Sequence, residues 1–239
     1  MAATEGGFAV SGDGRALLGR IADNLERSRH EPVHAAAAVE APAPLAAELH
    51  DGAALLARFS AEWQALAGQV HEARTANEAA AIVAEICRVH EARTILAWSE
   101  AAIGVDGLAE ALGRCGLDVD GGVLPADRDS RMVRLQALAE VRVGVTGADA
   151  LLAESGSVVL ASGPGRPRLA SLLPPVHVTI ARTDRIFQSL EHLLAADPSL
   201  GVAGSNLVAI SGPSRTADIE MTLTRGVHGP GEVHVILMK

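Results

Sequence analysis

The stretch Val143–Ser162, VGVTGADALLAESGSVVLAS, carries the signals that decide the fold of this chain. Its first apolar run, Val143–Val145, and its second, Ser157–Ala161, are typical of buried strands. Glycines between the two runs let the backbone approach a ligand or another strand, because no Cβ atom stands in the way. The stretch therefore predicts two strands joined by a segment that carries polar side chains.

Helical and strand patterns alternate on both sides of this stretch. Apolar spacings of three and four residues predict helices, and short apolar runs predict further strands. The helices are expected over Leu45–Leu66, Thr75–Val89, Leu108–Leu112, Ser130–Leu138 and Asp184–Ala195, and the strands over Gln69–Glu72, Arg93–Trp98, Val176–Ile180, Leu207–Ile210 and Val233–Leu237. Thr75 with Glu78 forms a capping box. The alternation predicts an α/β fold with a mainly parallel sheet flanked by helices.

The N-terminal part of the chain lacks this alternation of helices and strands. Apolar residues at helical spacing within Gly14–Arg29 predict one short amphipathic helix, and Glu31–Pro44, EPVHAAAAVEAPAP, is typical of a linker. We therefore divide the chain into an N-terminal helix with its Pro/Ala-rich linker, residues 1–44, and an α/β domain, residues 45–239.

Composition excludes several classes of protein. A net charge of −9 argues against a binder of nucleic-acid backbones, and aromatic residues, at 2%, are too few to form a stacking platform. The single lysine is Lys239, so no Schiff-base lysine is expected in the body of the chain. No run approaches the roughly 20 apolar residues of a membrane span, and the N-terminus does not resemble an export signal. A cytoplasmic protein is expected.

The cysteine content limits metal chemistry. Cys87 and Cys115 are the only two cysteines and lie far apart in sequence, which indicates neither a disulfide framework nor a zinc ribbon. An iron-sulfur cluster normally takes four thiolates, so this chain alone is not expected to bind one.

The first candidate site lies inside Val143–Ser162. If residues 149–153 form a short helix, Gly147 can cap it beside Asp149, and Glu154 stands at the entry to a buried strand. A buried carboxylate with a raised pKa could act as a general base or a nucleophile. An ion pair with an arginine, or a backbone cap, explains Glu154 equally well.

The second candidate site follows the strand Leu207–Ile210. A strand, a glycine turn, hydroxyl groups and a helix start would leave backbone N–H groups free for phosphate or carboxylate, and Arg215 could add a forked contact. The residues concerned are Gly212, Ser214, Arg215, Thr216 and Asp218. An ordinary strand-to-helix turn is the alternative, since the segment lacks the lysine of a P-loop.

Two further polar turns accompany these sites. His228 stands between Gly226 and Gly229, where an imidazole is suited to relaying a proton or binding a ligand. His228 and His234 lack a clear third partner, so no metal site is expected. The turn that carries Arg166 and Arg168 either lines the same pocket or is a solvated loop.

Four motifs in this order resemble the LUD-domain family, in its lactate-utilisation protein C branch. They are GVTGADALLAESGSVVL, SLLPPVHV, SGPSRTADIE and RGVHGPGEVHVIL, within 144–237. The resemblance implies a NagB/RpiA/CoA-transferase-like fold and a role in a multi-protein iron-sulfur system that oxidises L-lactate to pyruvate. In that system the partner proteins carry the clusters.

The resemblance leaves the chemistry of this component open. Glu154-Ser155-Gly156 is similar to the E-x-G turn that carries the nucleophilic glutamate of CoA transferases, and the segment after Leu207–Ile210 is similar in kind to phosphate loops of sugar-phosphate isomerases. We therefore consider a cluster-free component that binds a small carboxylate or phosphate, an enzyme that uses Glu154 and His228, and a non-catalytic scaffold. The sequence is compatible with a homo-oligomer as well as with a monomer.

Overall fold

The computed structural model describes residues 16, 19–24, 26, 51–201, 204, 206–217 and 223–239. The chain divides into two units, Met1–Ala46 and Ala47–Lys239. In the first unit, residues 16, 19–24 and 26 are helical, in agreement with the predicted amphipathic helix, and Ile21 on it is exposed. The predicted linker lies outside the described residues.

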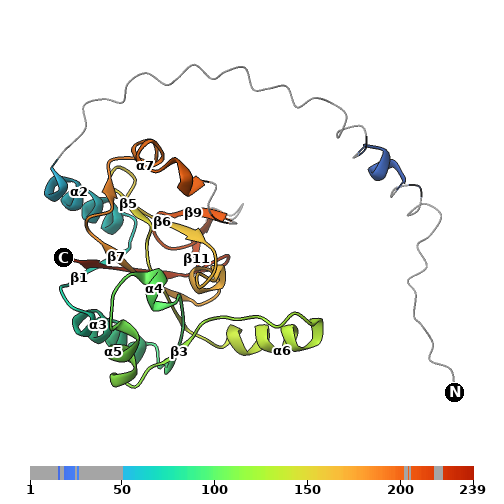
Figure 1. Cartoon of the computed structure of the whole chain (residues 1–239), viewed down its shortest axis with the longest axis horizontal. Helices are drawn as coiled ribbons and strands as arrows, with labels where there is room; N and C mark the ends of the chain where they lie inside the picture. Colours follow the sequence, from blue (N-terminus) through green and yellow to red (C-terminus); the bar gives the residue numbers. More distant parts are fainter. Residues whose placement is uncertain are drawn as a thin grey trace, which may run out of the picture. The chain divides into compact units, whose positions relative to one another are not determined.

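A six-stranded parallel sheet forms the centre of the second unit, with the strand order β1-β12-β7-β4-β2-β3 (Figure 1). The strands are β1 (Gln69–Ala73), β2 (Thr94–Ala97), β3 (Asp118–Asp120), β4 (Val143–Thr146), β7 (Val176–Arg182) and β12 (Glu232–Met238). Strand β4 and all of β7 except Arg182 are buried on both faces, so the sequences of these strands do not alternate between apolar and exposed polar residues. The predicted fold class, a mainly parallel sheet flanked by helices, is confirmed.

Helices α2, α3, α5 and α6 lie in segments predicted to be helical, whereas the short helix α4 was not predicted. They are α2 (Gly52–Ala65), α3 (Ala76–Val89), α4 (Glu100–Ile103), α5 (Leu108–Arg114), α6 (Arg128–Ala139) and α7 (Leu190–Ala196), with 3-10 turns η1 (Arg168–Ser171) and η2 (Pro198–Gly201). At the start of α3, the Glu78 N–H donates to Thr75 Oγ1 at 3.2 Å, as the capping box predicts. The predicted helix over Asp184–Ala195 is wrong in its first half, where β8 (Ile186–Phe187) forms instead.

A second sheet, which the sequence did not predict, joins four strands in the order β8-β5-β6-β9. Besides β8 it contains β5 (Ala150–Leu152), β6 (Ser157–Ser162) and β9 (Asn206–Ile210). A short helix over residues 149–153 is therefore wrong. These residues extend into β5, and the turn 153–156 returns the chain antiparallel along β6. Every residue of β5 and β6 is buried, which explains why their pattern does not alternate.

Two hydrophobic clusters hold these layers together. On one face of the central sheet, Val83 of α3 and Leu112 of α5 pack with Val178 and Ile236. On the opposite face, Phe59 and Trp63 of α2 pack with β5, β6 and alternate residues of β12. Since sheet residues alternate between faces, β12 contributes to both clusters.

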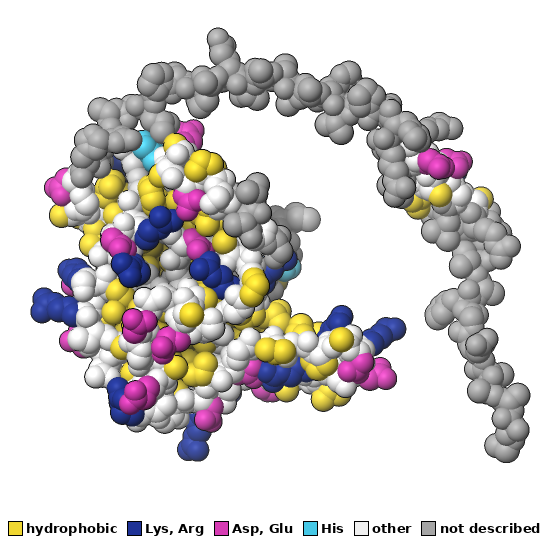
Figure 2. Space-filling model, in the orientation of Figure 1, with side chains coloured by type: hydrophobic (Ala, Val, Ile, Leu, Met, Phe, Trp, Pro, Cys, Tyr) yellow, Lys and Arg dark blue, Asp and Glu magenta, His cyan; other side chains and the backbone are white. Residues whose placement is uncertain are grey.

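Helix α6 projects from the body of this unit (Figures 1 and 2). Leu138 is its one buried residue, whereas Met132 and Val133 are exposed by 52% and 67%. Within the described residues, no helix is long and apolar enough to cross a membrane.

Candidate functional site

The order of the central strands locates a crevice between β2 and β4. From β2 the chain passes outward to β3, whereas from β4 it passes in the opposite direction to β7 and then β12. The loops that follow β2 and β4 therefore separate at the carboxyl ends of these strands. Open α/β sheets bind their ligands at such a switch point.

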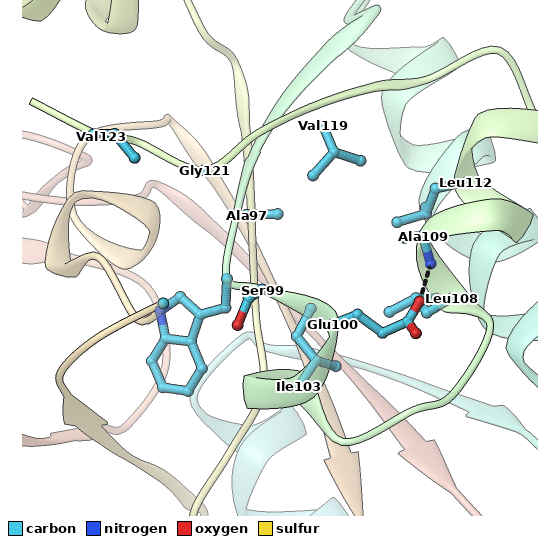
Figure 3. Close-up of a pocket in the computed structure, with 12 residues that line it drawn as sticks. Ala97, Ser99, Glu100, Ile103, Leu108, Ala109, Leu112, Val119, Gly121 and Val123 are labelled. Atoms are coloured by element: carbon cyan, nitrogen blue, oxygen red, sulfur yellow. Dashed lines mark hydrogen bonds between the residues drawn. The ribbon is translucent and has the colours of Figure 1, made fainter.

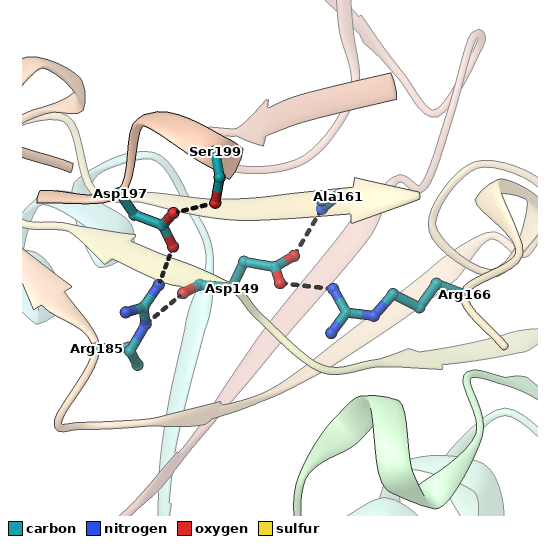
Figure 4. A network of polar contacts seen from close by, with 6 residues as sticks. All are labelled: Asp149, Ala161, Arg166, Arg185, Asp197 and Ser199. Carbon is teal, nitrogen blue, oxygen red and sulfur yellow. Dashed lines mark hydrogen bonds and ion pairs between the residues drawn. The ribbon is translucent and has the colours of Figure 1, made fainter. Parts of the chain in front are cut away.

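Asp149 lies in the loop after β4 and is tightly bound. Its Oδ2 accepts from the Ala161 N–H at 2.7 Å, and its Oδ1 accepts from Arg166 Nη1 at 2.6 Å (Figure 4). The side chain of Asp149 is 12% exposed and that of Arg166 31%. The contact fixes the guanidinium group but occupies few of its five N–H donors, so Arg166 retains the capacity to bind an anion.

Trp98 supports Arg166 from the neighbouring loop. The guanidinium carbon of Arg166 lies 5.1 Å from the centre of the indole ring, within the range of a cation–π contact. The indole N–H donates to Pro167 O at 3.3 Å, and the Ser99 N–H donates to Gly165 O at 2.9 Å. The loop that carries Arg166 is therefore joined to the end of β2 and is not a freely solvated loop.

The backbone of Asp149 is held by Arg185, which is itself paired with Asp197. Arg185 Nε donates to Asp149 O at 3.1 Å, and Arg185 Nη2 contacts Asp197 Oδ2 at 3.3 Å (Figure 4). Ser199 Oγ donates to the other oxygen of Asp197 at 2.7 Å. Side chain and main chain of Asp149 are thus fixed from two directions where the polypeptide crosses from the central sheet to the second sheet.

A cavity of about 270 Å³ opens beside this group (Figure 3). The ends of β2 and β3, helices α4 and α5, and Gly165 form its walls. Ser99 and Glu100 contribute polar atoms, but Glu100 Oε2 already accepts from the Ala109 N–H at 2.7 Å. The remaining wall is mostly apolar, which is usual for small-molecule sites.

Gly147 lies at the same carboxyl end as Asp149. A Cβ atom on Gly147 would stand 2.9 Å from Ile103 Cα of α4. The glycine therefore permits the close approach of the β4 loop to α4, and its first role is packing.

Glu154 lies at the far end of β5, in the turn before β6. Its side chain is 53% exposed, and its Oε1 is 3.9 Å from Arg58 Nη2 of α2. The expectation of a buried carboxylate is wrong, because the tight turn at Gly156 packs on Trp63 and directs Glu154 outward from the hairpin. The ion pair with an arginine, the alternative reading, is weak at this distance and exposure.

The expected helix start after Ser211 is also wrong. Residues 215–217 form strand β10, which pairs antiparallel with β11 (Leu223–Arg225). The Ser214 N–H donates to Pro230 O at 2.8 Å, so this N–H is not free for an anion. Gly212 is buried against Leu66, and Thr216 lies within the β10–β11 pair.

Arg215 does not point to an anion site among the described residues. It is exposed, and its Nη2 donates to the Leu66 carbonyl at the end of α2. His228 is exposed in the turn that leads to β12. Asp218 lies outside the described residues.

The two stretches that carry the candidate sites, Val143–Ser162 and the segment after Leu207–Ile210, do fold against each other. Their candidate residues do not form one site. Strands β6 and β9 are paired, and Ser157 Oγ lies 2.6 Å from Ser211 Oγ and 2.7 Å from Ser155 Oγ. This contact lies at the Glu154 end of the hairpin, whereas Asp149 lies at the other end, about 15 Å away by the rise of five extended residues. The predicted site residues therefore divide into two groups.

Sequence reasoning missed Trp98, Ser99 and Arg185 as members of a site and left Arg166 open. The one available signal was position, because Trp98 ends a predicted strand and Ser99 directly follows it. The contacts of Arg166 and Arg185 depend on the unpredicted second sheet.

A separate polar cluster joins β1 to β12. His71 Nε2 lies 3.0 Å from His234 Nδ1, and Glu232 contacts His234 Nε2 at 2.9 Å and His90 Nε2 at 3.2 Å. Burial lowers the pKa of His71 and, as the largest of several effects, that of His234. Across the described part of the chain, no group of three or more His, Cys, Asp or Glu side chains is arranged to hold a metal ion.

Fold and motif order define the class of the protein. Residues 56–238 match the family model of the LUD domain, so the chain belongs to the LUD domain family. The resemblance drawn from the four motifs is confirmed.

Relatives of known name share part of this chain. Lactate utilization protein C of Halalkalibacterium halodurans is 34% identical over 145 residues, which cover 59% of this chain and 60% of that protein. Lactate utilization protein C of Geobacillus sp. (strain WCH70) is 30% identical over 168 residues, covering 69% and 70%. The protein of the same name from Exiguobacterium sp. (strain ATCC BAA-1283 / AT1b) is 41% identical over 100 residues, covering 40% and 44%.

A solved structure shares the fold. The crystal structure of a DUF162 family protein from Deinococcus radiodurans matches with a TM-score of 0.58 at 21% identity, covering 79% of this chain and 99% of that chain. The arrangement of the sheets is therefore common to both chains.

Proposed function

We propose that this chain is the cluster-free component of a protein system that oxidises L-lactate to pyruvate, and that it binds a carboxylate beside Arg166. The names of its relatives support the pathway, since three of them are lactate utilization protein C. The observation that carries the binding site is the Arg166 guanidinium group, which Asp149 and Trp98 hold at the switch point of the sheet.

The chemistry of the ligand follows from Arg166. A guanidinium group fixed by one carboxylate can still donate to a second, and lactate and pyruvate each carry one. Low exposure of the Asp149–Arg166 pair reduces screening by water and strengthens such a contact. The Arg166 site therefore takes the place of the candidate residues Glu154, Arg215, Thr216 and His228 that the sequence suggested.

Electron transfer is assigned to partner proteins. Burial raises the pKa of the Cys87 thiol to about 11, and Cys115 is exposed without a second cysteine nearby in sequence. A protonated thiol is a poor metal ligand, because clusters are held by thiolates. The residues of this chain therefore do not fit a cluster, and iron-sulfur partners would supply that chemistry.

The test uses two arginines of one loop. Arg166→Gln removes the proposed anion contact, and Arg168→Gln makes the same change at an exposed arginine two residues later. In cells that depend on this chain for growth on L-lactate, we expect Arg166→Gln to abolish growth and Arg168→Gln to preserve it. Equal growth of both variants would contradict the site.

A pull-down separates binding from docking. We expect the Arg166→Gln protein to be captured by its iron-sulfur partners as efficiently as the unaltered chain. If Arg166→Gln abolishes both capture by the partners and growth on L-lactate, the chain is instead a scaffold whose Arg166 loop forms the docking surface.

A further inference from the structure

The cavity beside the β2 and β3 ends is larger and more apolar than a three-carbon acid requires. Its apolar wall consists of Ala97, Ile103, Leu108, Leu112, Val119 and Val123 (Figure 3). The methyl group of Ala97 and the side chains of Val119 and Leu112 border the same open space in this view. Nothing in the lactate proposal accounts for such a wall.

The volume of the cavity indicates the size of the ligand that would fill it. An apolar protein cavity of about 150 Å³ is large enough to bind benzene, which has six carbons. The cavity here measures about 270 Å³. The single methyl group of lactate would leave most of this space unfilled, and the unfilled wall would lose its dispersion contacts.

The cavity and the anion group share residues. Gly165 and Trp98 both line the cavity, and both adjoin Arg166: Gly165 precedes it in the chain, and the Trp98 ring lies 5.1 Å from its guanidinium carbon. Ser99, an exposed residue, also lines the cavity next to Gly165. Arg166 is not itself part of the cavity wall, but its neighbours Trp98 and Gly165 are, so a ligand that reaches from Arg166 past both of them would enter the cavity.

We infer that the ligand of this chain is a carboxylic acid with an apolar tail of about six carbons. Its carboxylate binds Arg166 and its tail occupies the β2–β3 cavity. This assignment rests on the proposed function for the head group and adds the class of ligand. It also gives the chain a binding partner distinct from lactate within a lactate-oxidising system.

The experiment is a titration of the full chain with straight-chain 2-hydroxy acids of three, four, six and eight carbons, followed by calorimetry. Each methylene that enters the cavity should tighten binding about fourfold, until the cavity is full. Val119→Phe fills the cavity from its rim at a site that is 46% exposed and should remove this dependence. Val133→Phe makes the same change on α6, outside the cavity wall, and should preserve it.

The two proposals fail in different ways. Equal affinity for all four acids, still abolished by Arg166→Gln, would overturn the tail and retain the head group. A length dependence that survives both Val119→Phe and a second filling variant, Ala97→Val, would also overturn the cavity assignment. If none of the four acids binds, both the head-group site at Arg166 and the tail assignment are wrong. We expect the length dependence to be lost in Val119→Phe and in Ala97→Val and to be kept in Val133→Phe, and we expect all four acids to bind more weakly to Arg166→Gln.

Discussion

The two ends of the β5–β6 hairpin differ in almost every property that matters for a binding site. At the Asp149 end, a nearly buried carboxylate accepts from a backbone N–H and from Arg166. At the Glu154 end, an exposed carboxylate stands 3.9 Å from Arg58. Both residues are acidic and flank glycine-containing turns, but only the first is fixed by short contacts. Proximity in sequence therefore did not indicate membership of one site.

The largest expected effect compares the two carboxylates directly. Asp149→Ala leaves the Ala161 N–H and Arg166 without their partner in a nearly buried position, and should lower the free energy of unfolding by about 2–3 kcal/mol. Glu154→Ala should change it by less than about 0.5 kcal/mol, because exposed ion pairs contribute little. Urea unfolding of both variants measures the difference. Equal losses of unfolding free energy in the two variants would show that the two ends of the hairpin do not differ in how firmly their carboxylates are held.

A second variant asks what the Glu154 end contributes to the fold. Gly156 has φ +54°, and a Cβ atom there would stand 2.6 Å from Trp63 N. Gly156→Ala should therefore cost about 2 kcal/mol, from a strained backbone and a clash with main-chain atoms. Gly163→Ala in the Arg166 loop, where a Cβ meets nothing within 4 Å, is the control and should unfold as the unaltered chain does. A stable Gly156→Ala protein would mean that this turn does not constrain the hairpin.

The third prediction concerns pH. His177 lies fully buried on β7, and its Nε2 contacts Thr146 Oγ1 at the end of β4 at 2.9 Å. Burial, with a smaller effect of His234, lowers the pKa of His177 to about 3. The unfolded chain therefore binds more protons than the folded chain below about pH 6.5, so this histidine contributes stability above that pH and the contribution is lost progressively toward pH 3.

Denaturant unfolding between pH 7.5 and pH 4.5 measures this slope. Lowered pKa values at His71 and His234 add to it with the same sign. We expect His177→Gln to flatten the slope by up to about 1.4 kcal/mol per pH unit, the limit for one proton. His228→Gln makes the same substitution at an exposed histidine in the turn before β12 and serves as the control. A slope unaffected by His177→Gln would contradict a neutral buried imidazole.

The smallest effect is expected at Arg215. Its guanidinium group donates to the Leu66 carbonyl while remaining exposed. Arg215→Ala should lower the free energy of unfolding by about 0.5–1 kcal/mol and leave carboxylate binding unchanged. A tenfold loss of carboxylate affinity in this variant would indicate that the ligand binds at the Ser211–Thr216 segment instead.

Sequence patterns predicted the central sheet well because its strands and helices obey simple periods. The strands β4, β7 and β12 were confirmed to within two residues at each end. The N-cap bond to Thr75 was confirmed as well, although the Glu78 carboxylate accepts from the Arg74 N–H and not from the Thr75 N–H of a capping box. The second sheet was missed because β5 is three residues long and fully buried, so residues 149–153 gave no alternation.

The site was harder to predict for a physical reason. Arg166 and Trp98 lie 68 positions apart in the sequence, and their contact needs both the central sheet, which places Trp98 after β2, and the second sheet, in which β6 leads into the Arg166 loop. Glu154 looked buried because apolar residues surround it in sequence. The turn at Gly156 instead directs the apolar neighbours inward and the carboxylate outward.

The most direct test of the central claim is a chemical-shift titration of the isotopically labelled full chain with a straight-chain eight-carbon 2-hydroxy acid, whose apolar tail has six carbons. Our account predicts that the largest shifts of backbone amides occur at Ser99, at Gly147–Asp149 and at Gly165–Arg166. Shifts confined to Glu154–Ser157 and Ser211–Thr216, with the Arg166 loop unchanged, would contradict it.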